Sequence, residues 1–241
     1  TRVHDVTTSE ASLTLRYAPG ESFVNSKQRR VPVSLDAPIF TLTHAMGFKG
    51  VLGGDYSFNR TEASVWKRFW LPASWGKIDC SLKAGAEWNT VPFPLLILPE
   101  ANLSYITQRE TFNLINNMEF LTDRYASMSL SYDMNGKLFN RIPLIKNLKW
   151  REMFRVRALW GTLTDKNNPF KSNNPDLFRF PTRDGKFTSF VMDPKVPYIE
   201  GSVGIYNIFK LLHVEYVHRF TYRDNPGINK NGIRFMVLMV F

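Results

Sequence analysis

Apolar and polar residues alternate at period two along much of the chain, which is the pattern of half-buried β-strands. The clearest stretches are Glu10–Tyr17, Lys77–Asn89, Asp123–Met134 and Leu212–Arg223. Less regular stretches predict strands at Ile39–Met46, Tyr56–Leu71, Phe112–Phe120, Arg151–Leu163 and Tyr198–Phe209. The pattern of Tyr56–Leu71 loses its phase midway, so we expect a bulge or a projecting strand there. Together with the end of the chain, the pattern predicts about ten strands.

The last ten residues, Gly232–Phe241, form the most regular of these stretches. One face carries the predicted closing set of Ile233, Phe235, Val237, Met239 and Phe241. Such an apolar comb with an aromatic final residue is typical of the strand that closes a bacterial outer-membrane barrel. An unpaired strand edge in lipid has no water to satisfy its N–H and C=O groups. We therefore expect the last strand to pair with the first.

Composition favours a membrane barrel over a helical membrane protein. No stretch reaches the roughly 18 uncharged apolar residues of a membrane helix, and the most apolar window, Val91–Leu98, is broken by two prolines. Aromatic residues make up 14% of the chain, enough for the interfacial girdles of a barrel. We predict an all-β fold, a transmembrane antiparallel β-barrel of outer-membrane type. A β-sandwich is the alternative.

The sequence also bounds the protein's location and partners. Thr1 begins a polar run with no initiator Met and no signal peptide, so we expect residues 1–241 to be the carboxy-terminal barrel domain of a longer parent. The expected location is the outer membrane of a Gram-negative bacterium. The net charge is +10, but the basic residues are scattered, so nucleic acid is not an expected partner. Expected partners are outer-membrane lipids and lipopolysaccharide, with other outer-membrane proteins or lipoproteins as further candidates.

Strand order predicts the side on which each loop lies, if the carboxy-terminal strand ends at the periplasm. The loops assigned to the cell surface are Pro19–Ala37, Thr164–Pro197 and Asp224–Asn231. Those assigned to the periplasm are Gly47–Asp55, Val91–Gln108, Lys137–Lys149 and a tight turn near Lys210.

Several runs resemble, in the same order, the carboxy-terminal barrel of a Bacteroidota outer-membrane family called carboxypeptidase-like regulatory domain-containing proteins. The runs are Phe112–Phe120, Asp123–Ala126, Phe139–Leu144, Lys149–Glu152, Gly204–Lys210 and Tyr216–Tyr222. The resemblance implies a barrel of unknown function, preceded in full-length members by a signal peptide and a small β-sandwich domain. It implies no peptidase activity. A more distant likeness to the insertase and translocase superfamily lacks that superfamily's Arg-Gly-Phe/Tyr loop motif.

Motifs of catalysis are absent from the sequence. It contains neither Gly-x-Ser-x-Gly nor His-Glu-x-x-His, and its histidines are scattered at His4, His44, His213 and His218. We therefore expect no enzyme, with no catalytic, cofactor-binding or metal-binding residue and no cofactor. A hydrolase at the barrel rim is the weakest alternative.

Charged residues on the inward-facing side are the main candidate site. The candidates are Arg16, Asp79, Lys83, Glu87, Arg155, Arg157, Glu215, Arg219, Arg223 and Arg234. Asp123 and Glu200 are also predicted to point inward. They either line a selective path or fill the lumen with cross-strand ion pairs, and the second interpretation is favoured. A structural cluster is expected from Glu119, Asp123, Arg124, Arg151 and Glu152.

These expectations favour a non-enzymatic outer-membrane protein that takes part in envelope protein assembly, export or scaffolding. A passive or gated solute channel is the alternative.

Overall fold

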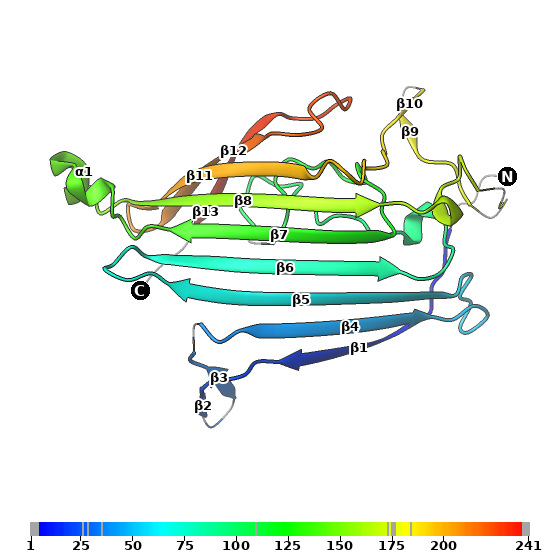
Figure 1. The fold of residues 1–241 in the computed structure, drawn as a ribbon, viewed down its shortest axis with the longest axis horizontal. Coiled ribbons are helices and arrows are strands. Elements are labelled where there is room, and N and C mark those ends of the chain that lie inside the picture. The colour runs from blue at the N-terminus through cyan, green and yellow to red at the C-terminus, as the bar shows by residue number, and fades with distance from the viewer. Residues whose placement is uncertain are drawn as a thin grey trace.

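Nine strands form one antiparallel sheet, in which each strand lies beside the next main strand of the chain (Figure 1). The structure, a computed structural model, describes residues 5–25, 27, 29–34, 36–108, 110–172, 174, 177–183 and 185–237. The nine strands are β1 (Glu10–Tyr17), β4 (Ile39–Gly47), β5 (Phe58–Trp70), β6 (Lys77–Glu87), β7 (Arg124–Asp133), β8 (Arg151–Thr162), β11 (Tyr198–Ile208), β12 (Leu212–Arg219) and β13 (Asn231–Val237). The all-β antiparallel prediction is confirmed.

Short elements occupy the connections between these strands. Two hairpins pair β2 (Phe23–Asn25) with β3 (Arg30–Pro32) and β9 (Thr182–Arg183) with β10 (Lys186–Phe187). The helical turns are η1 (Phe93–Leu95), η2 (Phe139–Arg141), η3 (Asp165–Asn167) and α1 (Pro143–Leu148). Among the residues that the structure describes, no helix is long and apolar enough to cross a membrane.

The alternation along β5 is continuous, so of the two expectations for Tyr56–Leu71 the bulge was wrong, and the projecting strand stays a prediction. β5 pairs with β4 and β6 without a register shift. The phase only appears to slip because Trp66 shares the inner face with Arg68, whereas the charged Lys67 points outward. The register shift of the sheet lies instead in β11, between Ile205 and Ile208.

Residues 88–123, which we call the inner segment, leave β6 and cover the inner face of the sheet before β7 begins (Figure 1). Phe112–Phe120 lies here and makes only isolated bridges at its two ends, to Ala101 and Phe190. The strand expected at these residues was therefore wrong. An apolar run this short does not separate a strand from a buried coil by its periodicity.

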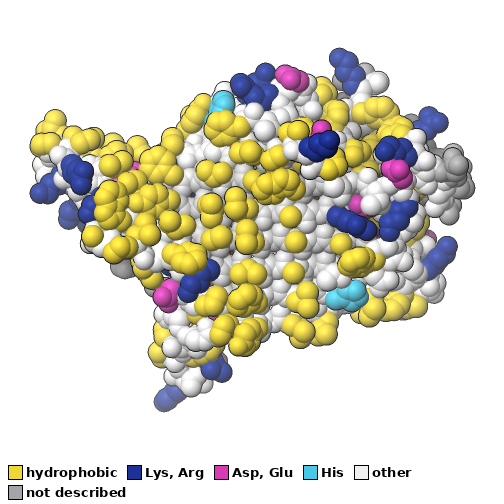
Figure 2. Space-filling model, viewed as in Figure 1, with side chains coloured by type: hydrophobic (Ala, Val, Ile, Leu, Met, Phe, Trp, Pro, Cys, Tyr) yellow, Lys and Arg dark blue, Asp and Glu magenta, His cyan; other side chains and the backbone are white. Residues whose placement is uncertain are grey.

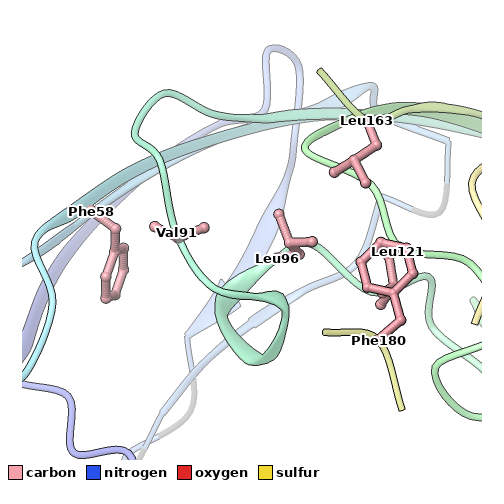
Figure 3. Packing of buried hydrophobic residues seen from close by; sticks show 6 residues of the cluster. All are labelled: Phe58, Val91, Leu96, Leu121, Leu163 and Phe180. Atoms are coloured by element: carbon pink, nitrogen blue, oxygen red, sulfur yellow. The ribbon is translucent and has the colours of Figure 1, made fainter. Parts of the chain in front are cut away.

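Two hydrophobic clusters fasten the inner segment to the sheet and its loops. The first contains Phe58, Val91, Leu96, Leu121, Leu163 and Phe180 (Figure 3). The second contains Phe112, Ile115, Phe120, Leu159, Met192 and Tyr198. The core of the molecule thus lies between the inner face of the sheet and a folded connection.

One miscounted strand also reversed the predicted sides of the early loops. The α1 end of the sheet holds residues 18–38, 71–76, 134–150 and 209–211, and the opposite β10 end holds residues 48–57, 88–123, 163–197 and 220–230 (Figure 1). Pro19–Ala37 therefore lies at the same end of the sheet as the Lys210 turn. Gly47–Asp55 and Val91–Gln108 lie at the opposite end, together with Thr164–Pro197. The prediction placed each of these on the other side, because it counted Phe112–Phe120 as a strand.

The sheet is open in the described part of the chain. β1 and β13 are its two edges, and no described pairing joins them. The expected pairing of the last strand with the first is therefore not observed. Ile233, Phe235 and Val237 lie on the outward face of β13, as predicted from the pattern, and all three are exposed. Met239 and Phe241 lie outside the described residues.

Candidate functional site

A network of buried ion pairs lies on the inner face, across β8, β11 and β12. Arg157 on β8 faces Glu200 on β11, and Arg157 Nη1 lies 3.0 Å from Glu200 Oε1. The Glu200 carboxylate also accepts hydrogen bonds from the backbone N–H groups of Asn113 and Leu114 and from the Tyr198 hydroxyl. Since Asn113 and Leu114 belong to the inner segment, this carboxylate joins that segment to the sheet.

A second pair reaches across an intervening strand. Arg155 Nη1 on β8 lies 2.9 Å from both carboxylate oxygens of Glu215 on β12. The residues of β11 opposite these two are Ser202 and Gly204, and their small size leaves room for the long side chains to meet. The Ser202 hydroxyl donates to Glu215, and His213 Nε2 lies 3.4 Å from the same carboxylate.

The third pair fixes the end of the inner segment. Arg219 on β12 and Glu119 form a bidentate contact, with Nη2–Oε1 at 2.6 Å and Nη1–Oε2 at 3.0 Å. Arg219 Nη1 also donates to the Leu114 carbonyl, and its guanidinium carbon lies 4.8 Å from the centre of the Tyr198 ring. Asn225, in the loop after β12, donates to Glu119. One buried pair therefore holds β12, the inner segment and a loop together.

The expected cluster of Glu119, Asp123, Arg124, Arg151 and Glu152 does not form one site. Glu119 pairs with Arg219, as described above. Asp123, at the end of the inner segment, accepts hydrogen bonds from Thr164 and Asn167. Glu152 is buried beside the 134–150 loop and accepts the Leu138 N–H at 2.7 Å.

The predicted inward residues fall into two groups. Glu87, Asp123, Arg155, Arg157, Glu200, Glu215 and Arg219 are all buried. The rest lie in more open positions. Three of them form ion pairs: Arg16 with Glu21, Asp79 with Arg68, and Lys83 with Glu100 and Glu110. Arg234 donates to the Asn113 carbonyl, and Arg223 is exposed in the loop after β12. Arg223 falls outside its expected strand because β12 ends at Arg219.

The burial of these ion pairs gives the network a role in holding the fold together. A buried charge is tolerated when it is paired and hydrogen-bonded, and removing one partner is costly. Arg157, Glu200, Arg219 and Glu215 are all 2% exposed or less, so these charges do not line a water-filled path. The arrangement fixes the register of three strands and holds the inner segment against them.

The described histidines lie in separate places. His44 Nδ1 lies 2.9 Å from Thr61 Oγ1, and His218 Nδ1 lies 2.6 Å from Asn231 Oδ1, whereas His213 contacts Glu215. Among the residues that the structure covers, no group of three or more His, Cys, Asp or Glu is placed to hold a metal ion. The absence of enzymatic activity stays a prediction.

The outer face of the sheet is strongly apolar (Figure 2). Exposed hydrophobic side chains from seven of its strands include Leu13, Leu15, Phe40, Leu42, Leu82, Val156, Val203, Tyr216 and Ile233. The charged residues at outward positions of the described strands are Lys67, Arg124 and the buried Glu152, all near strand ends. The face that carries the exposed apolar residues is thus almost free of charge across the middle of the sheet.

An apolar outer face and an inner face filled with ion pairs and a folded connection define the class: an all-β protein built on one antiparallel meander sheet. The chain belongs to a family of unknown function, DUF5686, whose C-terminal domain model matches residues 2–172. No curated protein matches the chain. The match ends in the loop after β8, so β11, β12 and β13 lie beyond it. The carboxypeptidase-like regulatory name and the Bacteroidota origin are not part of this match and stay predictions.

Proposed function

We propose that the protein is a non-enzymatic outer-membrane component whose sheet lies in the lipid and which serves envelope protein assembly, export or scaffolding. The observation that carries this proposal is the apolar, nearly uncharged outer face of the nine strands (Figure 2). In water, such a face would be unusual, because monomeric soluble proteins rarely expose large contiguous apolar patches. In a bilayer the same face would be the stable arrangement, because outward apolar and inward polar residues alternate in membrane-spanning sheets.

The buried ion pairs and the inner segment on the inner face support a scaffold over a solute channel. A selective channel needs charged side chains that contact water along the path. The buried charges instead form ion pairs with one another, Arg157 with Glu200 and Arg155 with Glu215. The inner segment adds apolar cover through Phe112, which lies in the second cluster. The channel therefore ranks second, and it would require the inner segment to move.

The expected lipid partners follow from the same face. Outer-membrane phospholipids and lipopolysaccharide are the proposed surroundings of Leu82 and Val156. Outward aromatic side chains near strand ends, such as Tyr17 at the α1 end and Trp88 at the β10 end, suit the two membrane interfaces. Other outer-membrane proteins or lipoproteins are the proposed protein partners.

Two measurements on the tagged protein test this function. Purification from its own outer membrane in mild detergent, read by mass spectrometry, is expected to recover the same envelope proteins reproducibly. In a planar bilayer the purified protein is expected to give no steady stepwise conductance. A protein that is recovered alone and that conducts in regular steps would contradict the scaffold function and favour the channel.

A further inference from the structure

The two edges of the sheet run in the same direction. Every neighbouring pair among the nine strands is antiparallel. Because nine is an odd number, β1 and β13 both run from the β10 end to the α1 end (Figure 1). Joining β1 to β13 would therefore create a parallel pair, whereas bacterial single-chain membrane barrels have an even number of antiparallel strands.

A second copy of the chain does not remove this conflict. Copies inserted into a membrane in one orientation present the same strand direction at both edges. Any pair between β1 of one copy and β1 or β13 of the other is then also parallel. An antiparallel neighbour for β1 must therefore come from polypeptide other than residues 10–237 of such copies.

The two edges also differ in how far they are covered. At β13, the Phe235 N–H donates to the Tyr105 carbonyl at 2.8 Å, and the Phe235 carbonyl accepts the Thr107 N–H at 2.7 Å. The inner segment thus occupies part of this edge. β1 has β4 as its pairing partner in the described residues, and all of its residues from Glu10 to Tyr17 are exposed. The more open edge of the sheet is therefore β1.

The side chains of β1 show what chemistry its neighbour needs. Leu13, Leu15 and Tyr17 are 64%, 57% and 68% exposed and continue the apolar outer face to the β1 edge of the sheet. Ser12 and Thr14 point to the inner side and are small and polar. In lipid, the free N–H and C=O groups of this edge would have no water to bind.

We propose that the edge of β1 binds an antiparallel, amphipathic β-strand supplied by polypeptide outside residues 10–237. This strand runs from the α1 end to the β10 end, with apolar residues outward and small or polar residues facing Ser12 and Thr14. Main-chain hydrogen bonds supply the binding and the alternation supplies the selectivity, as in other cases of strand addition. The inference rests on the proposed membrane location, because it is lipid that makes the open edge untenable.

The chain's own β4 provides a probe for this edge, because it already pairs antiparallel with β1. In that register Ala11 faces Met46 and Tyr17 faces Phe40. Synthetic peptides of residues 39–47, carrying Met46→Cys or Phe40→Cys, are added to the folded 241-residue protein in micelles. The protein carries Cys80→Ser together with either Ala11→Cys or Tyr17→Cys. A scrambled peptide of the same composition is the control.

Strand direction decides the outcome. The Ala11→Cys protein is expected to form a disulfide with the Met46→Cys peptide, and the Tyr17→Cys protein with the Phe40→Cys peptide. Each should form about tenfold faster than the exchanged combinations, because only directly opposite residues bring their Cβ atoms within reach. The scrambled peptide should show no preference for either position.

Two results would overturn the inference. One is a folded protein that forms no peptide disulfide or shows the reversed preference. The other is a rapid intramolecular disulfide in a variant with Ala11→Cys and Ile233→Cys, which would mean that β1 closes directly on β13. Insertion into lipid is measured separately by acyl-chain quenching. A protein that binds the peptide but does not insert into lipid contradicts only the proposed membrane function. A protein that inserts but does not bind the peptide contradicts only this inference.

Discussion

The buried pair of Glu119 and Arg219 gives the sharpest test of how the inner segment is held. Both side chains are 1% exposed or less, so Glu119→Gln leaves a buried guanidinium without its counter-charge. Breaking a buried pair in this way costs about 3–5 kcal/mol. Arg219 keeps the carbonyls of Leu114, Thr221 and Tyr222 as acceptors. We therefore expect the lower part of that range, about 3 kcal/mol.

Urea unfolding of the protein in micelles, followed by fluorescence of its six Trp residues, measures this free energy. A double variant, Glu119→Leu with Arg219→Met, removes both charges and should cost at least about 2 kcal/mol less than the sum of its single variants. Lys171→Ala is the matched control, since its ion pair with Asp165 is more than half exposed and should contribute no more than about 1 kcal/mol. A Glu119→Gln protein as stable as the control would refute the role of the pair.

Three further changes test other parts of the fold. Leu82→Arg in the middle of the outer face should destabilise the protein in bilayers by about 2–4 kcal/mol, whereas Leu144→Arg on the exposed α1 should stay within about 0.5 kcal/mol. Gly85→Val should cost about 1–3 kcal/mol in the same assay, because a Cβ at Gly85 would lie 2.5 Å from the Tyr125 ring. Burial raises the pKa of Tyr222, so its hydroxyl stays protonated at neutral pH and donates to the carbonyl of residue 196 at 2.6 Å. Tyr222→Phe should therefore lower the free energy of unfolding by about 1 kcal/mol, and an unchanged unfolding midpoint would contradict this.

Alternation along the chain was enough to predict the strands and the two faces of the sheet. The face assigned to Leu82 and Ala84 is exposed, and the opposite face places Glu87 in the interior. These features are local, because side chains in a strand point to alternate faces at period two. The prediction failed where an apolar run has no period, as in Phe112–Phe120, and that single error also reversed the sides of the early loops.

The ion pairs could not be assigned from the sequence, because their partners are distant along the chain. Arg219 and Glu119 are 100 residues apart, and Asn113 and Glu200 are 87 residues apart. The inward position of Arg219 was predicted, but its partner depended on the path of the inner segment. The small residues Ser202 and Gly204, opposite Arg155 and Glu215, were a signal that long inward side chains could meet across β11.

The proposed function requires that the outer face of the sheet contacts lipid acyl chains. The most direct measurement uses a fluorescent label on single cysteines in a Cys80→Ser protein, reconstituted in vesicles with brominated acyl chains. Labels at Leu82 and Val156 on the outer face are expected to be strongly quenched, and labels at Ser81 and Ser129 on the inner face are not. Equal quenching of both sets, or none at the outer positions of the folded protein, would contradict the claim.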